Sequence, residues 1–228
     1  PYFKRSEHYR STGDATYRGQ GGPLVVEDYR TILPLTHYFV EAAQEAGFEF
    51  SPDLNGARQE GVGYSQMTRD GRRRASTAQT FLRAAEGRPN LTVIPNAQAT
   101  GLTFDGTRCT GVSYTSGSGV DHIEAAREVI VSGGAVNSPH LLQISGIGPA
   151  DHVKGLGIDV VYDSPGVGAN LQDHYVLRVA HRMRDVISIN QLSRGWRVAR
   201  EALRWLVMGD GALTFGVTSA QVFRSEEH

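Results

Sequence analysis

The feature that most constrains the fold is the junction at residues 128–148. Residues 129–131 are Val-Ile-Val, an apolar run without alternation that is typical of a strand covered on both faces in a parallel sheet. Gly133 and Gly134 follow without a linker, Ser138-Pro139 predicts the start of a helix, and Gly146 predicts its end. A strand that runs directly into a helix is the repeating unit of open α/β sheets, so the sequence predicts an α/β fold.

The same junction also suggests a binding site. Gly133 and Gly134 have no Cβ, so the backbone can approach a ligand closely at the carboxyl end of the strand, the edge at which open α/β sheets bind ligands. The N–H groups of a helix N-terminus suit a nucleotide phosphate or ribose. A tight turn without any ligand explains the glycines equally well. The complete dinucleotide fingerprint Gly-x-Gly-x-x-Gly does not occur in the sequence, so the phosphate-cradling turn is not encoded in these residues.

The remaining residues predict a mixture of helices, short strands and loops. Between residues 99 and 125, β-favouring runs alternate with Asp-Gly and Gly-Ser turns, which predicts a β-meander. The other predicted elements are strands at 23–26, 91–94, 128–131 and 158–162, helices at 34–46, 76–85 and 195–208, and a loop-rich stretch at 53–74.

The predicted helix at 195–208 has an apolar face and an arginine-rich face. A solvated arginine face is the favoured interpretation, and association with a membrane surface is the less favoured one. The net charge of the whole chain is -1, so no general attraction to nucleic acid is expected.

Cysteine and histidine usage narrows the chemistry further. Cys109 is the only cysteine, which excludes an internal disulfide framework and multi-cysteine metal sites, and a cytoplasmic location is expected. Three histidines directly follow aspartates in the sequence, which is not the one-face spacing of metal ligands, so no metal site is predicted.

The segment GAVNSPHLLQISGIG at 134–148 resembles the second signature of the glucose-methanol-choline (GMC) oxidoreductases, a family with choline dehydrogenase-like and alcohol dehydrogenase-like members. The resemblance extends over nearly the whole chain in family order. Its further blocks are YFKRSE at 2–7, NG at 55–56 with QEGVG at 59–63, RASTA at 74–78, NLTV at 90–93 and PGVGANLQDH at 165–174.

This resemblance implies an FAD-dependent enzyme that oxidises a small-molecule alcohol, with the electron acceptor left open. A histidine base takes the hydroxyl proton while the carbon gives hydride to flavin N5. The resemblance also implies that the backbone of Ala99 meets the adenine and that Ser132 and Gly133 lie near the adenosine half. From the residues alone, Ala99 is equally well explained as a small inward-facing strand residue.

The resemblance implies part of a Rossmann-like FAD-binding domain with a β-meander, followed by the start of an α+β substrate domain. Three segments are expected. Residues 1–88 form the flavin-covering and connecting region of the FAD domain, and residues 89–172 form its sheet with the meander and the signature. Residues 173–228 begin the substrate domain. The family's first flavin-binding strand is expected before Pro1 and its catalytic histidine after His228. No catalytic residue is therefore assigned in this chain, and the segment alone is expected to be inactive.

Two other functions stay open at this stage. The missing fingerprint argues against a nicotinamide-linked dehydrogenase, and a non-enzymatic nucleotide-binding or scaffold module is the other alternative. Within the GMC resemblance, residues 211–220 look more like members that act on aliphatic or aryl primary alcohols than like those that act on choline.

Overall fold

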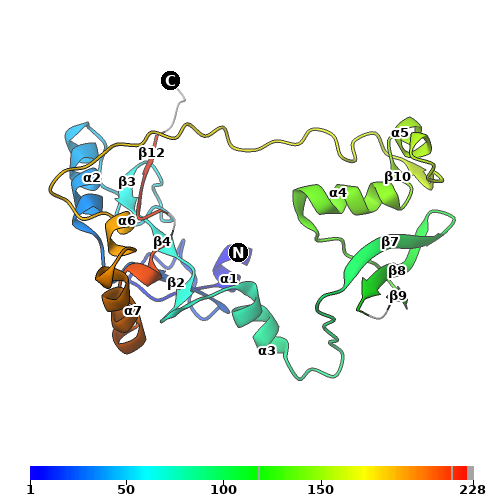
Figure 1. Ribbon diagram of the computed structural model, residues 1–228, viewed down its shortest axis with the longest axis horizontal. Coiled ribbons are helices and arrows are strands. Elements are labelled where there is room, and N and C mark those ends of the chain that lie inside the picture. The colour runs from blue at the N-terminus through cyan, green and yellow to red at the C-terminus, as the bar shows by residue number, and fades with distance from the viewer. Residues whose placement is uncertain (118, 217, 225–228) are drawn as a thin grey trace. The chain divides into compact units, whose positions relative to one another are not determined.

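The computed structural model describes residues 1–117, 119–216 and 218–224 (Figure 1). They form two compact units. The first unit combines Pro1–Leu91 with the described part of the segment that begins at Ala180, and the second unit is Thr92–Val179. The first and third of the predicted segments thus fold together, although they are far apart in sequence. The roles assigned to the segments remain predictions.

The first unit consists of helices and small sheets, as an α/β sequence predicts. A three-stranded sheet has the order β1-β2-β4, in which β1 and β2 are parallel, and a two-stranded antiparallel sheet joins β3 to β12. The helical elements are α1 (Tyr2–Ser6), α2 (Pro34–Glu45), η1 (Ala78–Leu82, a π-helical turn), α3 (Arg83–Ala85), α6 (Ile189–Leu192), α7 (Trp196–Met208) and η2 (Ala212–Thr214). The strands are β1 (Glu7–Tyr9), β2 (Leu24–Asp28), β3 (Gly61–Tyr64), β4 (Gln66–Met67), β5 (Arg69–Asp70), β6 (Arg73–Arg74) and β12 (Ala220–Phe223).

Charged side chains occupy the interior of the first unit. Glu27 on β2 is 5% exposed and Arg69 on β5 is 3% exposed, and Arg69 Nε donates to Glu27 Oε2 at 3.2 Å. The guanidinium of Arg18, also buried, stacks 3.7 Å from the centroid of the Tyr9 ring. Burial, a hydrogen bond to Asp28 and the nearby carboxylates raise the pKa of Tyr9 to about 12. Paired charges and stacking therefore share the interior of this unit with a small apolar core that includes Val25, Val40 and Val62.

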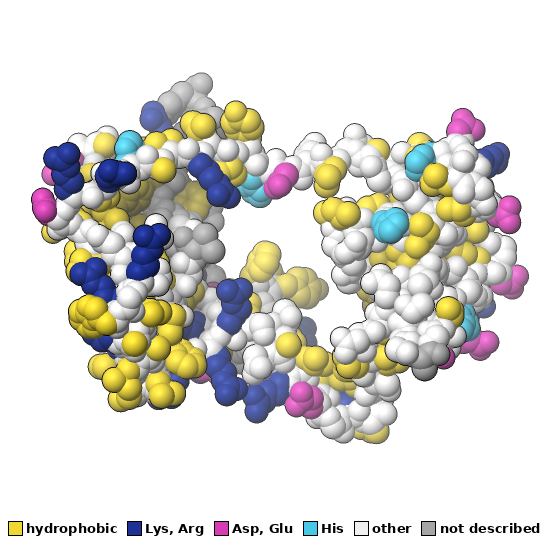
Figure 2. All heavy atoms as spheres, viewed as in Figure 1, with side chains coloured by type: hydrophobic (Ala, Val, Ile, Leu, Met, Phe, Trp, Pro, Cys, Tyr) yellow, Lys and Arg dark blue, Asp and Glu magenta, His cyan; other side chains and the backbone are white. Residues whose placement is uncertain are grey.

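Helix α7 keeps an exposed arginine face, as predicted, since Arg194, just before the helix, and Arg200 are exposed, but its apolar face is not buried. The buried residue of this helix is Glu201, which accepts a hydrogen bond from the backbone N–H of Ala212 at 2.9 Å, and Arg204 bonds to Thr31 and Asp210. Trp196, Leu203 and Val207 are instead more than half exposed, and Figure 2 shows hydrophobic side chains gathered over this helix. Glu201 and Arg204 are therefore held to the rest of the unit by hydrogen bonds, while the side chain of Arg200 stays 54% exposed.

No helix in the described part of the chain has both the length and the apolar character needed to cross a membrane.

The second unit confirms the predicted meander. Strands β7 (Gln98–Asp105), β8 (Arg108–Ser116) and β9 (Gly119–Glu124) form an antiparallel sheet in that order, and α4 (Gly134–Ile144) lies against β7 (Figure 1). The parallel pair β10 (Ile147–Gly148) and β11 (Tyr162–Asp163) flanks α5 (Ala150–Gly155). Ser145 connects the helix to the sheet, because its Oγ accepts a hydrogen bond from Leu102 N at 2.8 Å.

Several predicted strands are wrong in this structure. Residues 128–131 and 91–94 join no sheet within the described chain, and Ile130 is 79% exposed rather than covered on both faces. Of the run 158–162, only Tyr162 pairs, as part of β11. The loop-rich stretch at 53–74 contains the short strands β3 to β6. A strand needs a hydrogen-bonding neighbour, and local composition does not show whether one is present.

The signature helix also begins earlier than predicted. Helix α4 starts at Gly134, where φ is 86°, and not at Ser138, so Pro139 lies inside the helix. A proline there removes one helical N–H donor, a cost that the packing of the helix has to offset. The predicted end is confirmed, since Gly146 follows the helix with φ at 88°, a left-handed conformation that favours glycine.

Candidate functional site

The candidate site is a cavity of about 360 Å³ in the second unit, between the meander, the 129–133 segment and α4. The sequence-predicted residues Ala99, Ser132 and Gly133 all line it, although the first lies far from the other two in sequence. The full lining is Gln98, Ala99, Leu102, Val112, Val129, Ile130, Val131, Ser132, Gly133, Asn137, His140, Leu141 and Ile144. Tertiary folding thus brings the residues that were predicted to contact the cofactor to one place.

Strand β7 forms one wall. It is an outer strand of the meander, and within the described residues it pairs with β8 alone. Ala99 pairs with Tyr114, and the register shifts between Ala99 and Gly101. Such a bulge bends the strand and redirects its side chains, and bulges recur beside binding sites. The bulge therefore lies where the backbone of Ala99 meets the cavity.

Helix α4 forms the opposite wall through residues at helical spacing. Asn137, His140, Leu141 and Ile144 share one face because residues three, four and seven positions apart align on a helix. Leu142, one position further on, lines a second cavity with the turn at 166–171. Asn137 and His140 were not predicted as site residues, although their spacing from Ile144 was a usable signal.

Gly133 sits at the turn between the 129–133 segment and α4. A Cβ built there would lie 3.2 Å from the Cβ of Asn137 and 3.2 Å from the backbone N of Ser138, which is tighter than ordinary contact. The missing side chain therefore allows the chain to turn closely into the helix and keeps the cavity open beside it.

The chemical character of the cavity suits a flat aromatic group. Aliphatic side chains from the sheet and from α4 form its walls, and the side chains of Gln98, Asn137 and His140 add donors and acceptors. Apolar walls with a few polar groups are the usual composition of a cofactor site. The residues present thus fit the adenine ring of a dinucleotide.

On the other side of α4, a second cavity of about 470 Å³ lies against the turn at 166–171. Gln143 on α4 donates a hydrogen bond to the carbonyl of Val167 at 3.0 Å and so holds this turn to the helix. Gly168 adopts φ of 81°, and a Cβ there would lie 2.5 Å from Nε2 of Gln143. The signature helix is thereby fixed between the meander and the turn of the PGVGANLQDH block.

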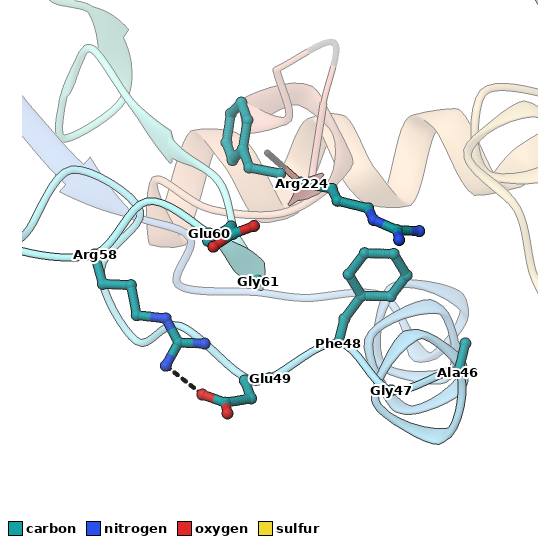
Figure 3. A pocket seen from close by; sticks show the side chains of 9 residues that line it. Ala46, Gly47, Phe48, Glu49, Arg58, Glu60, Gly61 and Arg224 are labelled. Atoms are coloured by element: carbon teal, nitrogen blue, oxygen red, sulfur yellow. Dashed lines mark ion pairs between the residues drawn. The ribbon is translucent and has the colours of Figure 1, made fainter. Parts of the chain in front are cut away.

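The first unit has a cavity of about 360 Å³ at the C-terminal end of α2 (Figure 3). Arg58 forms an ion pair with Glu49 at its rim, and Arg224 extends beside the ring of Phe48. Glu60 also lines it, so both signs of charge are present. Because positive and negative side chains both line this cavity, its charge does not favour a particular ligand.

Two histidines of the first unit make structural contacts. His37 Nδ1 lies 2.6 Å from the hydroxyl of Tyr64, and His8 Nδ1 accepts from Gly21 N at 2.8 Å. Among the residues described, no group of at least three His, Cys, Asp or Glu could hold a metal ion.

Comparison with known proteins addresses the family. The model of the GMC oxidoreductase family matches residues 1–176. An oxygen-dependent choline dehydrogenase from Brucella ovis is 41% identical over 228 residues, 99% of this chain, and one from Pseudomonas aeruginosa is 42% identical over 216 residues, 92% of this chain. An FAD-dependent oxidoreductase from Chaetomium thermophilum shares the fold, with a TM-score of 0.83 and 24% identity over 96% of this chain and 41% of its own.

The chain spans 41% and 38% of the length of the two choline dehydrogenases. The family match nevertheless covers both the signature helix and the cavity described above. It confirms the resemblance of the 134–148 segment and the α/β fold, and it supports FAD as the cofactor. By its sequence over most of its length and by its fold, this chain belongs to the GMC oxidoreductase family.

Proposed function

We propose that the cavity between β7 and α4 holds the adenosine half of FAD in a protein that oxidises a CH–OH group. One observation carries this proposal: Ala99, Ser132 and Gly133, which the family resemblance assigns to the adenosine half, line a single cavity. The resemblance assigned them from sequence motifs, while the cavity is defined by tertiary packing, so the agreement is independent support.

The roles of the residues follow from their positions. The aliphatic side chains of the cavity exclude water from the adenine faces, and burial of that ring stabilises the complex. The backbone of Ala99, beside the bulge in β7, offers hydrogen-bonding groups to the edge of the ring. Gly133 keeps side-chain atoms away from the ribose. Bound FAD supplies the hydride acceptor for alcohol oxidation.

The base that takes the alcohol proton is proposed to come from the part of the protein that these 228 residues do not include. The two choline dehydrogenases are more than twice as long as the matched segment, which leaves room for such a residue. His140 does not serve as the base in this proposal, because it lines the proposed adenosine cavity, whereas the flavin ring, which would accept the hydride, is the other half of FAD. The isolated chain is accordingly proposed to be inactive.

The substrate is proposed to be a small alcohol. The named relatives are choline dehydrogenases. The sequence of residues 211–220 instead favours an uncharged aliphatic or aryl alcohol; Val217 of this segment lies outside the described residues. A cavity of about 420 Å³ beside Ser219 and Ala220 supports the uncharged substrate, because its described lining combines Leu33, Phe39 and other neutral side chains. A quaternary ammonium group is normally met by carboxylates or an aromatic cage.

The test uses the full-length protein. Purified protein is expected to show a flavin absorption spectrum, and anaerobic addition of a primary alcohol is expected to bleach it. Choline, an aliphatic and an aryl alcohol are compared by kcat/KM, with the uncharged alcohols expected to be faster. A colourless protein that reduces NAD would overturn the proposal, and so would tight FAD binding with alcohol oxidation by the 228-residue chain alone.

A further inference from the structure

His140 occupies an unusual position on α4. It lines both the cavity toward the meander and the cavity toward the turn at 166–171. Among the described residues that line these two cavities, His140 alone has an ionisable side chain. An exposed imidazole at the mouth of an otherwise neutral cavity is available to a ligand.

Gln98 and Asn137 accompany His140 in the lining of the first cavity. The amide of Gln98 makes only a long contact, 3.4 Å, with the carbonyl of Ala99, and it comes from the opposite wall. The other lining side chains are aliphatic apart from Ser132, so polar recognition of a bound ring depends on few groups. An imidazole N–H donates to an acceptor, and adenine offers acceptor nitrogens along its edge.

We propose that His140 binds the adenosine half of FAD through a hydrogen bond from its imidazole, and so helps to select FAD over flavins that lack adenosine. This inference rests on the proposed function, because it requires the cavity to be the adenosine site. His140 is a cofactor-binding residue in this proposal and takes no part in the chemistry.

The experiment measures cofactor binding to full-length apoprotein. FAD, FMN and ADP are titrated into the wild type and His140→Ala, by flavin fluorescence for the first two and by calorimetry for ADP. One neutral hydrogen bond corresponds to a loss of about 5- to 10-fold in affinity. We expect that loss for FAD and ADP, and no change for FMN, which has no adenosine. His140→Gln, whose amide also donates, is expected to recover part of the affinity.

His122 on β9 provides a matched control, because it lies in the same unit but lines neither cavity. His122→Ala is expected to bind all of the ligands like the wild type. Equal losses for FAD and FMN in His140→Ala would indicate a structural role and overturn the inference, as would unchanged FAD and ADP affinity. If the wild type itself binds no FAD, the proposed function fails instead, so the two failures are distinguishable.

Discussion

The two units differ in what holds them together. In the first unit, Glu27, Arg69 and Arg18 are buried with their partners, and the described ion pairs other than that of His174 with Asp173 all lie there. In the second unit, the fully buried side chain is that of Val153, and a three-stranded meander and one helix enclose a cavity. The first unit thus combines paired charges with an apolar core around Val62, whereas the described ion pairs contribute little to the second unit, which relies on strand pairing and close backbone turns.

This difference shows where sequence motifs are informative. In the second unit, which holds the signature motifs, the tight turns contain glycines. These glycines either adopt a left-handed backbone or lie too close to a neighbour for a side chain, and they can be recognised in the sequence. The charged interior of the first unit is invisible there, because an isolated Glu or Arg is normally assigned to the surface. Substitutions in each unit, each with a control variant, test whether the two units are stabilised by different interactions.

The largest effect is expected for Glu27→Ala in the first unit. It would leave Arg69 buried without its carboxylate, and breaking such a pair costs about 3 to 5 kcal/mol. The measurement is urea unfolding followed by tryptophan fluorescence, since Trp196 and Trp205 both lie on α7 of this unit.

The control for Glu27→Ala is Glu49→Ala, which removes the exposed ion pair with Arg58. An exposed pair contributes about 0 to 1 kcal/mol. Equal losses in the two variants would show that the buried pair does not hold the first unit.

The next largest effect is expected for Gly146→Ala in the second unit. Its φ of 88° disfavours a side chain, and a Cβ would lie 2.4 Å from the carbonyl oxygen of Asp159. Strain and overlap together are expected to cost about 2 to 4 kcal/mol. Hydrogen exchange of the second unit, read by mass spectrometry, should rise accordingly.

Gly157→Ala separates strain from overlap. Its φ is 76°, but nothing lies within 4 Å of the added Cβ, so only the backbone term of about 1 kcal/mol is expected. If both alanine variants exchange alike, close approach at Gly146 does not contribute to this unit.

A smaller effect, about 1 kcal/mol, is expected for Ser145→Ala. This change removes the acceptor of Leu102 N and so weakens the connection between α4 and β7. Local hydrogen exchange at Leu102 should increase, and FAD affinity of the full-length protein should fall as the cavity wall loosens. Ser116→Ala, which removes a hydrogen bond to Asp121 on exposed strands, should leave both readouts unchanged.

The smallest difference is expected in the pH dependence of the first unit. Burial raises the pKa of Glu27, but hydrogen bonds from Gly71, Arg10 and Arg69 outweigh burial and lower it below its ordinary value of 4.5. A lowered folded-state pKa means that this stabilisation is present above pH 4.5 and is lost as the pH falls through the folded-state value. Acid titration by tryptophan fluorescence should show a shallower decline for Glu27→Gln, and identical curves would contradict this assignment.

Much of the local structure was predictable from sequence. Proline at residue 34 and glycine at residue 47 bound helix α2, and the first turn of the meander lies at Asp105-Gly106, as predicted, while Ser118 of the predicted Gly-Ser turn lies outside the described residues. The run at 128–131 was wrongly predicted as a strand. Its composition favours an extended backbone, but a strand also requires a second strand with which to form hydrogen bonds. The site was partly predictable: Ala99, Ser132 and Gly133 followed from the family resemblance, His140 had a helical spacing from Ile144 that could have been used, and Gln98 emerged only from packing.

The sequence by itself determined the family, the C-terminal ends of α2 and α4, the meander and the tight glycine turns, because each depends on residues close together along the chain. Tertiary structure alone decided that α7 buries Glu201 and leaves its apolar residues exposed, that 1–91 and the described segment from Ala180 form one unit, and that Ala99 and Gly133 line one cavity. Those outcomes depend on which distant groups meet and on whether buried charges find partners. Local composition carries no information about either.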